Sequence, residues 1–141
     1  MIRVAQGALT GFIAAIFEAA GSSSFEAERI ATHLVEADLL GHDSHGVMRV
    51  PIYCAWLDAG KVSPNRRARL IFDRGPMLGF DGDFGFGQVI GHDAMEAAAA
   101  RARETGVAVV AVRNSGHLGR IGAYAEQLAR AGMVSLHFVN S

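Results

Sequence analysis

Polar residues that bind anions or carry protons are concentrated between Asp38 and Tyr53, where two histidines, two aspartates, a serine and an arginine fall within about a dozen positions. Arginine offers a planar, two-pronged donor that matches a carboxylate, and histidine exchanges a proton near neutral pH. On a continuous helix, residues four apart are neighbours, so His45, Arg49 and Tyr53 would line one ridge beside Ser44. Such a ridge would suit a carboxylate ligand. From the spacing alone, a solvated helix face with capping residues explains the pattern equally well.

A second candidate lies in the loop after the apolar, β-branched run at 107–112. His117 stands there between Gly116 and Gly119, just before a predicted helix. Small residues let a ligand approach the backbone, and the free N–H groups of a helix N-terminus favour an anion. We therefore expect a functional role for His117.

Two amphipathic helices are predicted before the polar corner. Apolar residues recur at helical spacing from 9 to 20, and Gly21 is a suitable left-handed stop. A second helix is predicted from 24 to 38, because Ser23 begins a capping box and an apolar face follows. His33 lies one step outside that face, so we expect it to be partly exposed and without a catalytic role.

A third helix is predicted beyond the corner. Gly41 is a suitable stop for the second helix, and Asp43 or Ser44 is a suitable N-cap for the next one. The three helices should pack together. The third should bury an apolar stripe made of Val47, Val50, Pro51, Cys54 and Leu57.

From about residue 67 the spacing of apolar residues becomes strand-like. Runs at 70–72 and 77–80 flank a turn-rich linker, which predicts a hairpin. A helix is expected from about 92 to 104. The glycines before it do not match a Rossmann fingerprint, since the third comes one place late and no acidic residue stands near the expected offset. They are Gly85, Gly87 and Gly91.

A βαβ unit is predicted in the last part of the chain, from about 107 to 139. The run at 107–112 has the composition of a strand buried on both faces, a helix passes through Tyr124, and 133–139 reads as another strand. Such strands are normally parallel, with ligands near their carboxyl ends, where His117 lies. His137 would then be a structural residue on the second strand.

Composition narrows the class of protein. The 141 residues are 50% apolar and 19% charged, which suits a single domain with one hydrophobic core. The net charge is −1, which does not favour nucleic-acid binding, because proteins with that function carry a basic patch. The single cysteine fits a reducing cytoplasm, and no signal peptide or membrane-spanning run is apparent. No histidine set resembles a metal site. A metal-dependent hydrolase using His42, Asp43 and His45 remains an alternative, although it lacks a second ligand cluster.

Five ordered blocks resemble the type 2 malate/L-lactate dehydrogenase family. Its members are NAD(P)-dependent 2-hydroxyacid oxidoreductases, including malate, lactate, sulfolactate and ureidoglycolate dehydrogenases and cyclic-imine reductases. The resemblance implies an α/β fold of α+β character. A helical subdomain at 1–66 would precede the start of a non-Rossmann NAD(P)-binding mixed sheet domain at 67–141. The blocks are Leu34–Asp38, Gly41–Val47, Arg49–Tyr53, Asp81–Gln88 and Asn114–Gly119.

The resemblance also implies a reaction and roles for particular residues. The protein would move hydride between NAD or NADP and a small 2-hydroxy or 2-keto acid, or a cyclic imino acid. The protein itself must then hold the carboxylate and move one proton. The implied residues are His117, His45 and Ser44 for catalysis, with His117 as general acid/base; Arg49 and Tyr53 for the substrate; and His117, Gly119 and Gly122 for the cofactor.

Length adds a further expectation. Family members run to more than twice 141 residues, so the resemblance covers an amino-terminal portion, and much of the cofactor pocket is expected beyond Ser141. The family implies homodimers with sites completed across the interface. A strand at 133–139 would also leave an open edge that invites pairing. The alternative from another class is a catalytically silent, dimerising fragment or remnant.

Overall fold

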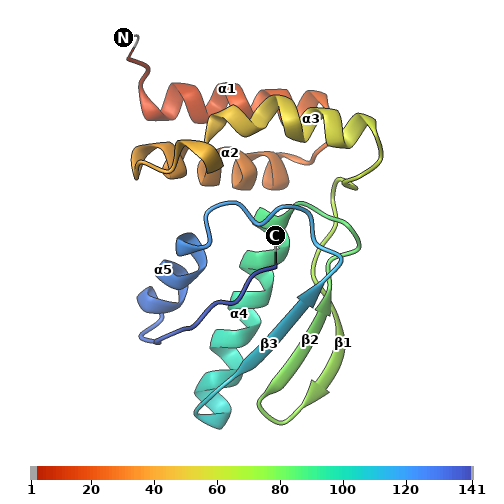
Figure 1. Ribbon diagram of the computed structural model, residues 1–141, viewed down its shortest axis with the longest axis vertical. Helices are drawn as coiled ribbons and strands as arrows, with labels where there is room; N and C mark the ends of the chain where they lie inside the picture. The colour runs from red at the N-terminus through yellow and green to blue at the C-terminus, as the bar shows by residue number, and fades with distance from the viewer. Residues whose placement is uncertain (1–2, 141) are drawn as a thin grey trace.

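Helices α1, α2 and α3 lie together at one end of the molecule, and a small sheet with α4 and α5 forms the other end (Figure 1). The structure is a computed structural model and describes residues 3–140. The predicted mixture of helices followed by a mixed sheet is confirmed, whereas the division into domains at residue 66 stays a prediction. The elements are α1 (Gln6–Ala19), α2 (Ser24–Leu39), the 3-10 turns η1 (Asp43–His45) and η2 (Val47–Arg49), α3 (Val50–Asp58), β1 (Arg69–Arg74), β2 (Met77–Asp81), α4 (Gly87–Thr105), β3 (Val109–Arg113) and α5 (Gly122–Arg130).

The start of α2 shows how the loop before the sheet is attached to the helices. Ser23 Oγ accepts the N–H of Glu26 at 3.3 Å, as a capping box predicts. The Glu26 carboxylate does not return to Ser23 but accepts the N–H of Asn65 at 2.9 and 3.0 Å. Asn65 Oδ1 in turn accepts the N–H of Ser23 at 2.7 Å. The capping box is therefore completed by a residue from the loop after α3.

The core of the helical end is centred on aromatic rings. Phe17 packs edge-on against Phe86 with ring centroids 5.6 Å apart, and Tyr53 lies 5.9 Å from the same ring. Ile30 and Leu34 of α2 are fully buried around them. Phe86 immediately precedes α4, so this core joins the helices to the part of the chain that contains the sheet.

The predicted stripe on the third helix is partly wrong. Pro51 is exposed and Cys54 is only half-buried, while Tyr53, which was predicted on the polar ridge, is 1% exposed. The reason is that α3 begins only at Val50, after two 3-10 turns. A 3-10 turn has about 3.0 residues rather than 3.6, so the faces lose the phase of one continuous α-helix.

The sheet has the order β1-β2-β3 within the described residues. The predicted hairpin is present, with β1 and β2 antiparallel. β2 and β3 are parallel, from Met77 opposite Val109 to Asp81 opposite Arg113, and α4 is the crossover between them. The βαβ unit is thus β2–α4–β3. Its helix begins at Gly87, earlier than predicted, and Ala94 packs against the sheet.

Two predictions for the last part of the chain are wrong. β3 is an edge strand rather than one buried on both faces, and Val109 is 59% exposed. Residues 133–139 form no strand, so His137 is not a strand residue. Apolar alternation favours a strand only where a neighbour supplies backbone partners, and no strand among residues 3–140 pairs with this segment. Its side chains at 134, 136 and 138 are 99%, 84% and 94% exposed.

None of the helices within residues 3–140 combines the length and the apolar character needed to cross a membrane.

Candidate functional site

The polar corner between α2 and α3 is held in place by Asp38. Its Oδ2 accepts the N–H of Val47 at 3.0 Å, at the start of η2. Gly46 is buried beneath this carboxylate, and a Cβ at that position would lie 1.6 Å from Asp38 Oδ1. No side-chain cap is formed by Asp43 or Ser44, so the predicted N-cap is wrong. Asp38 performs that function from the end of the preceding helix.

Three of the predicted site residues remain together in the corner, although not as a helical ridge. Ser44 Oγ lies 2.9 Å from His45 Nδ1. The Nε of Arg49 donates to the backbone oxygen of Ser44 at 2.6 Å. Because two short 3-10 turns, separated by the extended Gly46, replace a continuous helix here, the predicted spacing of four does not apply. The Nη groups of Arg49 have no hydrogen-bond partner in the part of the chain that the structure describes.

His117 reaches this corner from the loop between β3 and α5, which passes beside α2 (Figure 1). Its ring stacks on His45 with centroids 5.4 Å apart and an interplanar angle of 26°. The hydroxyl of Tyr53 lies 2.9 Å from His117 Nδ1, and Trp56 contributes a further ring at 6.4 Å. The structure therefore gathers all of the side chains predicted for catalysis and substrate binding: Ser44, His45, Arg49, Tyr53 and His117.

The contacts of His117 indicate which of its nitrogens a ligand can use. The N–H of Gly119 donates to Nδ1 at 3.2 Å, on the same nitrogen that Tyr53 contacts. A backbone N–H can only donate, so in the neutral ring Nδ1 is the acceptor and Nε2 carries the proton. Nε2 has no hydrogen-bond partner within residues 3–140, and it is the nitrogen available to a ligand.

Gln88 is a site residue that sequence reasoning did not assign. Its Nε2 donates to the Tyr53 hydroxyl at 2.9 Å and to the backbone oxygen of His117 at 3.3 Å. The side chain is 1% exposed, and the position of Gln88 within the fourth family block is its only sequence signal. Tyr53 was predicted to contact substrate. Its hydroxyl is engaged by two protein partners, and a substrate contact stays a prediction.

The site favours neutral histidines. Burial lowers the pKa of His117, and the positive charge of Arg49 and the neighbouring His45 lower it further. Burial also lowers the pKa of His45, followed by the charges of Arg49 and His42. Burial raises the pKa of the Tyr53 hydroxyl, against a smaller opposite effect of the hydrogen bond from Gln88. All three groups are therefore favoured in their uncharged forms.

The two glycines predicted to contact the cofactor face protein atoms instead of open space. Gly119 has φ +72°, and a Cβ there would lie 2.4 Å from His33 Nε2 and 3.0 Å from Gln88 Nε2. A Cβ at Gly122 would lie 2.5 Å from Arg120 Nη1. Close packing surrounds Gly119, whereas the close neighbour at Gly122 is the end of the Arg120 side chain. Their contact with a cofactor stays a prediction.

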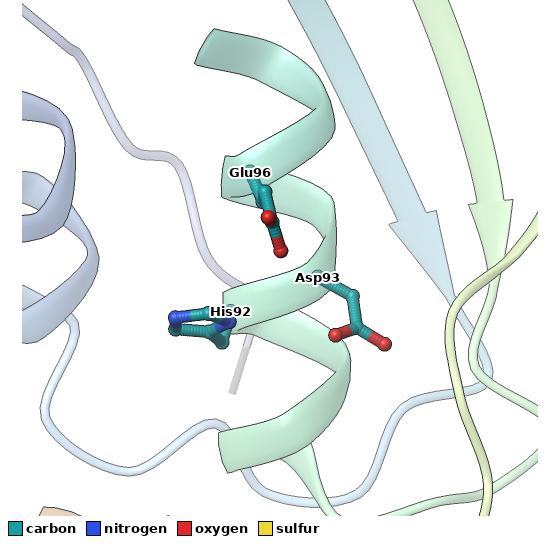
Figure 2. A group of neighbouring side chains, drawn as sticks. All are labelled: His92, Asp93 and Glu96. Atoms are coloured by element: carbon teal, nitrogen blue, oxygen red, sulfur yellow. The ribbon is translucent and has the colours of Figure 1, made fainter. Parts of the chain in front are cut away.

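One group on α4 brings metal-ligating side chains together, His92, Asp93 and Glu96 (Figure 2). The Asp93 carboxylate is already bound by Arg67, whose Nε and Nη2 donate to its two oxygens at 2.7 Å each. The charge of Arg67 already neutralises this carboxylate, which disfavours a bound cation at this group. The ligand set suggested for a hydrolase, around His42 and Asp43, does not form such a group within the described residues.

Comparison with known proteins identifies the family. The family model described as malate/L-lactate dehydrogenase matches residues 4–141, nearly the whole chain. This chain belongs to the malate/L-lactate dehydrogenase family. The predicted resemblance is therefore confirmed.

Individual members of the malate/L-lactate dehydrogenase family show how much of them the chain represents. It is 45% identical over 132 residues to hydroxycarboxylate dehydrogenase B of Escherichia coli K12, covering 94% of this chain and 37% of that protein. It is 46% identical over 114 residues to an L-lactate dehydrogenase of Cupriavidus necator, covering 81% of this chain and 33% of that one. The solved structure of malate dehydrogenase from Pyrococcus horikoshii superimposes with a TM-score of 0.90 at 38% identity, over 94% of this chain and 38% of that chain. The chain thus spans about a third of the length of these relatives.

Proposed function

We propose that this chain supplies the substrate-binding and proton-transfer groups of an oxidoreductase that moves hydride between NAD or NADP and a small 2-hydroxy or 2-keto acid, such as malate or lactate, or a cyclic imino acid. The observation that carries the proposal is the meeting of the Ser44–Arg49 corner with His117, from a loop far along the sequence. The names of the relatives, which are hydroxy-acid dehydrogenases, support the same reaction class.

Arg49 is the proposed carboxylate-binding residue. Its Nε is held by the backbone oxygen of Ser44 at 2.6 Å, which fixes the plane of the guanidinium. The outer Nη groups then present a two-pronged donor to a substrate carboxylate. The hydroxyl or carbonyl oxygen on the adjacent carbon would lie toward His117 Nε2, since the histidine rings and Arg49 share one corner.

His117 is the proposed general acid/base, and substrate binding would tune it. The charge of Arg49 is one of the causes that lower the pKa of His117. A bound carboxylate offsets that charge, so it should raise the pKa and favour protonation of the ring when a 2-keto acid is present. Tyr53 can donate to Nδ1 of the neutral ring or accept from Nδ1–H of the cation, whereas the Gly119 N–H can donate only to an unprotonated Nδ1, so protonation there would break that contact of 3.2 Å. Ser44 and His45 form the supporting relay pair.

A bound nicotinamide would supply or accept the hydride. The position of Gly119 does not fit a cofactor cradle, because its free face is filled by His33 and Gln88, and Gly122 faces the end of the Arg120 side chain. We therefore assign no step to contacts at these glycines. By similarity to the family, we further propose a homodimer in the cytoplasm, with no nucleic-acid or membrane partner and no metal requirement.

The test uses the protein at its full natural length. NADH and NADPH oxidation is followed with pyruvate, oxaloacetate and a cyclic imino acid, each with and without a chelator. The proposal predicts turnover with at least one acid or imine and no loss on chelation. Binding of neither nucleotide would favour a catalytically silent protein, and loss of activity on chelation would favour the metal-dependent alternative.

A further inference from the structure

We propose that His33 is a positioning residue of this site, because its imidazole accepts a hydrogen bond that fixes the His117 loop, residues 117–120, against α2. Its catalytic consequence rests on the proposed function, whereas the contact itself does not. The sequence suggested a partly exposed histidine without a role. That expectation is wrong as to exposure, since His33 is 7% exposed.

The contact is direct and joins distant parts of the chain. His33 Nε2 accepts the backbone N–H of Arg120 at 2.9 Å, across 87 positions of sequence. Gly119 packs so closely on the same nitrogen that a Cβ would lie 2.4 Å from it. The ring also lies 5.7 Å from that of Tyr124, centroid to centroid. His33 therefore has one fixed orientation, with Nε2 directed at the loop.

Within residues 3–140, three side chains from outside the His117 loop form hydrogen bonds with its backbone, and His33 has a distinct place among them. Gln88 of α4 donates to the backbone oxygen of His117 at 3.3 Å, and Tyr124 of α5 donates to that of Leu118 at 2.6 Å. Only His33 of these three belongs to α2, the helix that leads into the corner carrying His45. It thus sets the position of the loop relative to that corner, on which the stacking of His45 and His117 depends.

The hydrogen bond requires the neutral imidazole. An imidazolium would direct an N–H at the N–H of Arg120, with no lone pair between them. Burial is the largest cause that lowers the pKa of His33, and together with the nearby charges of Arg120, His117, His45 and Arg29 it brings that pKa to about 4. Among the nearby carboxylates, Glu126 is held in a bidentate pair with the Arg120 guanidinium, and Glu36 is exposed on α2.

Two substitutions at His33 distinguish the effect of its hydrogen-bond acceptor from the effect of its side-chain volume. His33→Gln places an amide group near the position of Nε2 and keeps an acceptor, whereas His33→Met fills similar space without one. Val35→Ala, on the same helix and also buried, is the matched control for a general loss of packing. Each variant of the full-length protein is compared with wild type by hydrogen exchange at the Arg120 amide and by steady-state kinetics with NADH or NADPH and a 2-keto acid.

In His33→Met we expect exchange at Arg120 to become at least about 10-fold faster and kcat to fall about 10- to 100-fold, with nucleotide affinity unchanged. His33→Gln should stay within about 3-fold of wild type, and Val35→Ala should leave the Arg120 amide protected. Unchanged exchange in His33→Met, or equal losses in the Gln and Met variants, would overturn the proposal. Exchange is measured without turnover, so a wild-type protein that reduces no substrate would refute the proposed function while the exchange result still decides the role of His33.

Discussion

Tyr53→Phe tests whether the site depends on the hydrogen-bond chain from Gln88 through Tyr53 to His117. The substitution keeps the buried ring and its packing against Phe17 and Phe86, and removes only the hydroxyl. That hydroxyl lies 2.9 Å from both Gln88 Nε2 and His117 Nδ1. Any effect can therefore be attributed to these two contacts.

The expected loss of stability follows from the hydrogen bonds that Gln88 keeps when the Tyr53 hydroxyl is removed. Gln88 keeps only the contact of 3.3 Å with the backbone oxygen of His117, and its Oε1 is already buried without a partner in the described part of the chain. A buried hydrogen bond contributes about 1 kcal/mol net, and an orphaned buried donor costs about 1–3 kcal/mol. We expect the free energy of unfolding to fall by about 2–3 kcal/mol. The loss of one positioning contact at His117 should lower kcat by about 10-fold.

Unfolding in urea and steady-state kinetics of the full-length protein provide the assay. Ile13→Ala is the matched control, because Ile13 of α1 is buried in the helical core and has no polar group that could hold the His117 loop. Stability should fall comparably in both variants, with the larger loss of kcat in Tyr53→Phe. Equal kinetics in the two variants would show that the Tyr53 hydroxyl is only structural and would refute this reasoning.

Three further predictions concern the corner and its support. Gly46→Ala should destabilise the protein by about 1–3 kcal/mol and lower kcat/KM, since the new methyl would displace the Asp38 carboxylate from Val47. The control is Gly11→Ala in α1, where the space is open, and it should be neutral or stabilising by about 0.5–1 kcal/mol. The reverse order of stability in chemical unfolding would contradict this account. Arg49→Lys should raise KM for 2-keto acids by a factor that corresponds to about 2–3 kcal/mol of lost binding energy, because lysine keeps the charge without the two-pronged geometry. Wild-type kinetics in this variant would remove Arg49 from the site. The folded-state pKa of His33, about 4, lies below its unfolded value of 6.5, so the stability that neutral His33 contributes is complete above pH 6.5 and is lost as the pH falls toward 4. The free energy of unfolding should therefore decrease from pH 7 to pH 5 by about 2 kcal/mol more in wild type than in His33→Gln. Equal decreases in the two proteins would show that His33 is not buried in the neutral form.

The site residues could be predicted from the sequence because their types reveal their chemistry, but their geometry could not. His45, Arg49 and Tyr53 were placed on one ridge by assuming a continuous α-helix. The 3-10 turns at 43–49 remove that phase, and Tyr53 points into the core while His117 arrives from elsewhere to join it. Hydrophobic periodicity reports only local spacing, so it cannot indicate a partner that is distant in sequence.

The same limitation explains the other differences. The burial of His33 depends on a backbone N–H 87 positions away, which local spacing cannot reveal. The hairpin was predictable because its turn residues lie between its strands, whereas the parallel pairing of β2 with β3 depends on the crossover through α4. Residues 133–139 have the composition of a strand, but pairing decides the structure, and the described residues provide no partner strand.

The most direct test of the central claim is the kinetic effect of His117→Asn in the full-length protein. Our account predicts that kcat for reduction of a 2-keto acid falls by about 10²–10⁴, while the affinity for NADH or NADPH, measured by fluorescence titration, is nearly unchanged. A variant that retains turnover within about 3-fold of wild type, while His45→Asn abolishes it, would contradict the assignment of His117 as the group that exchanges the proton.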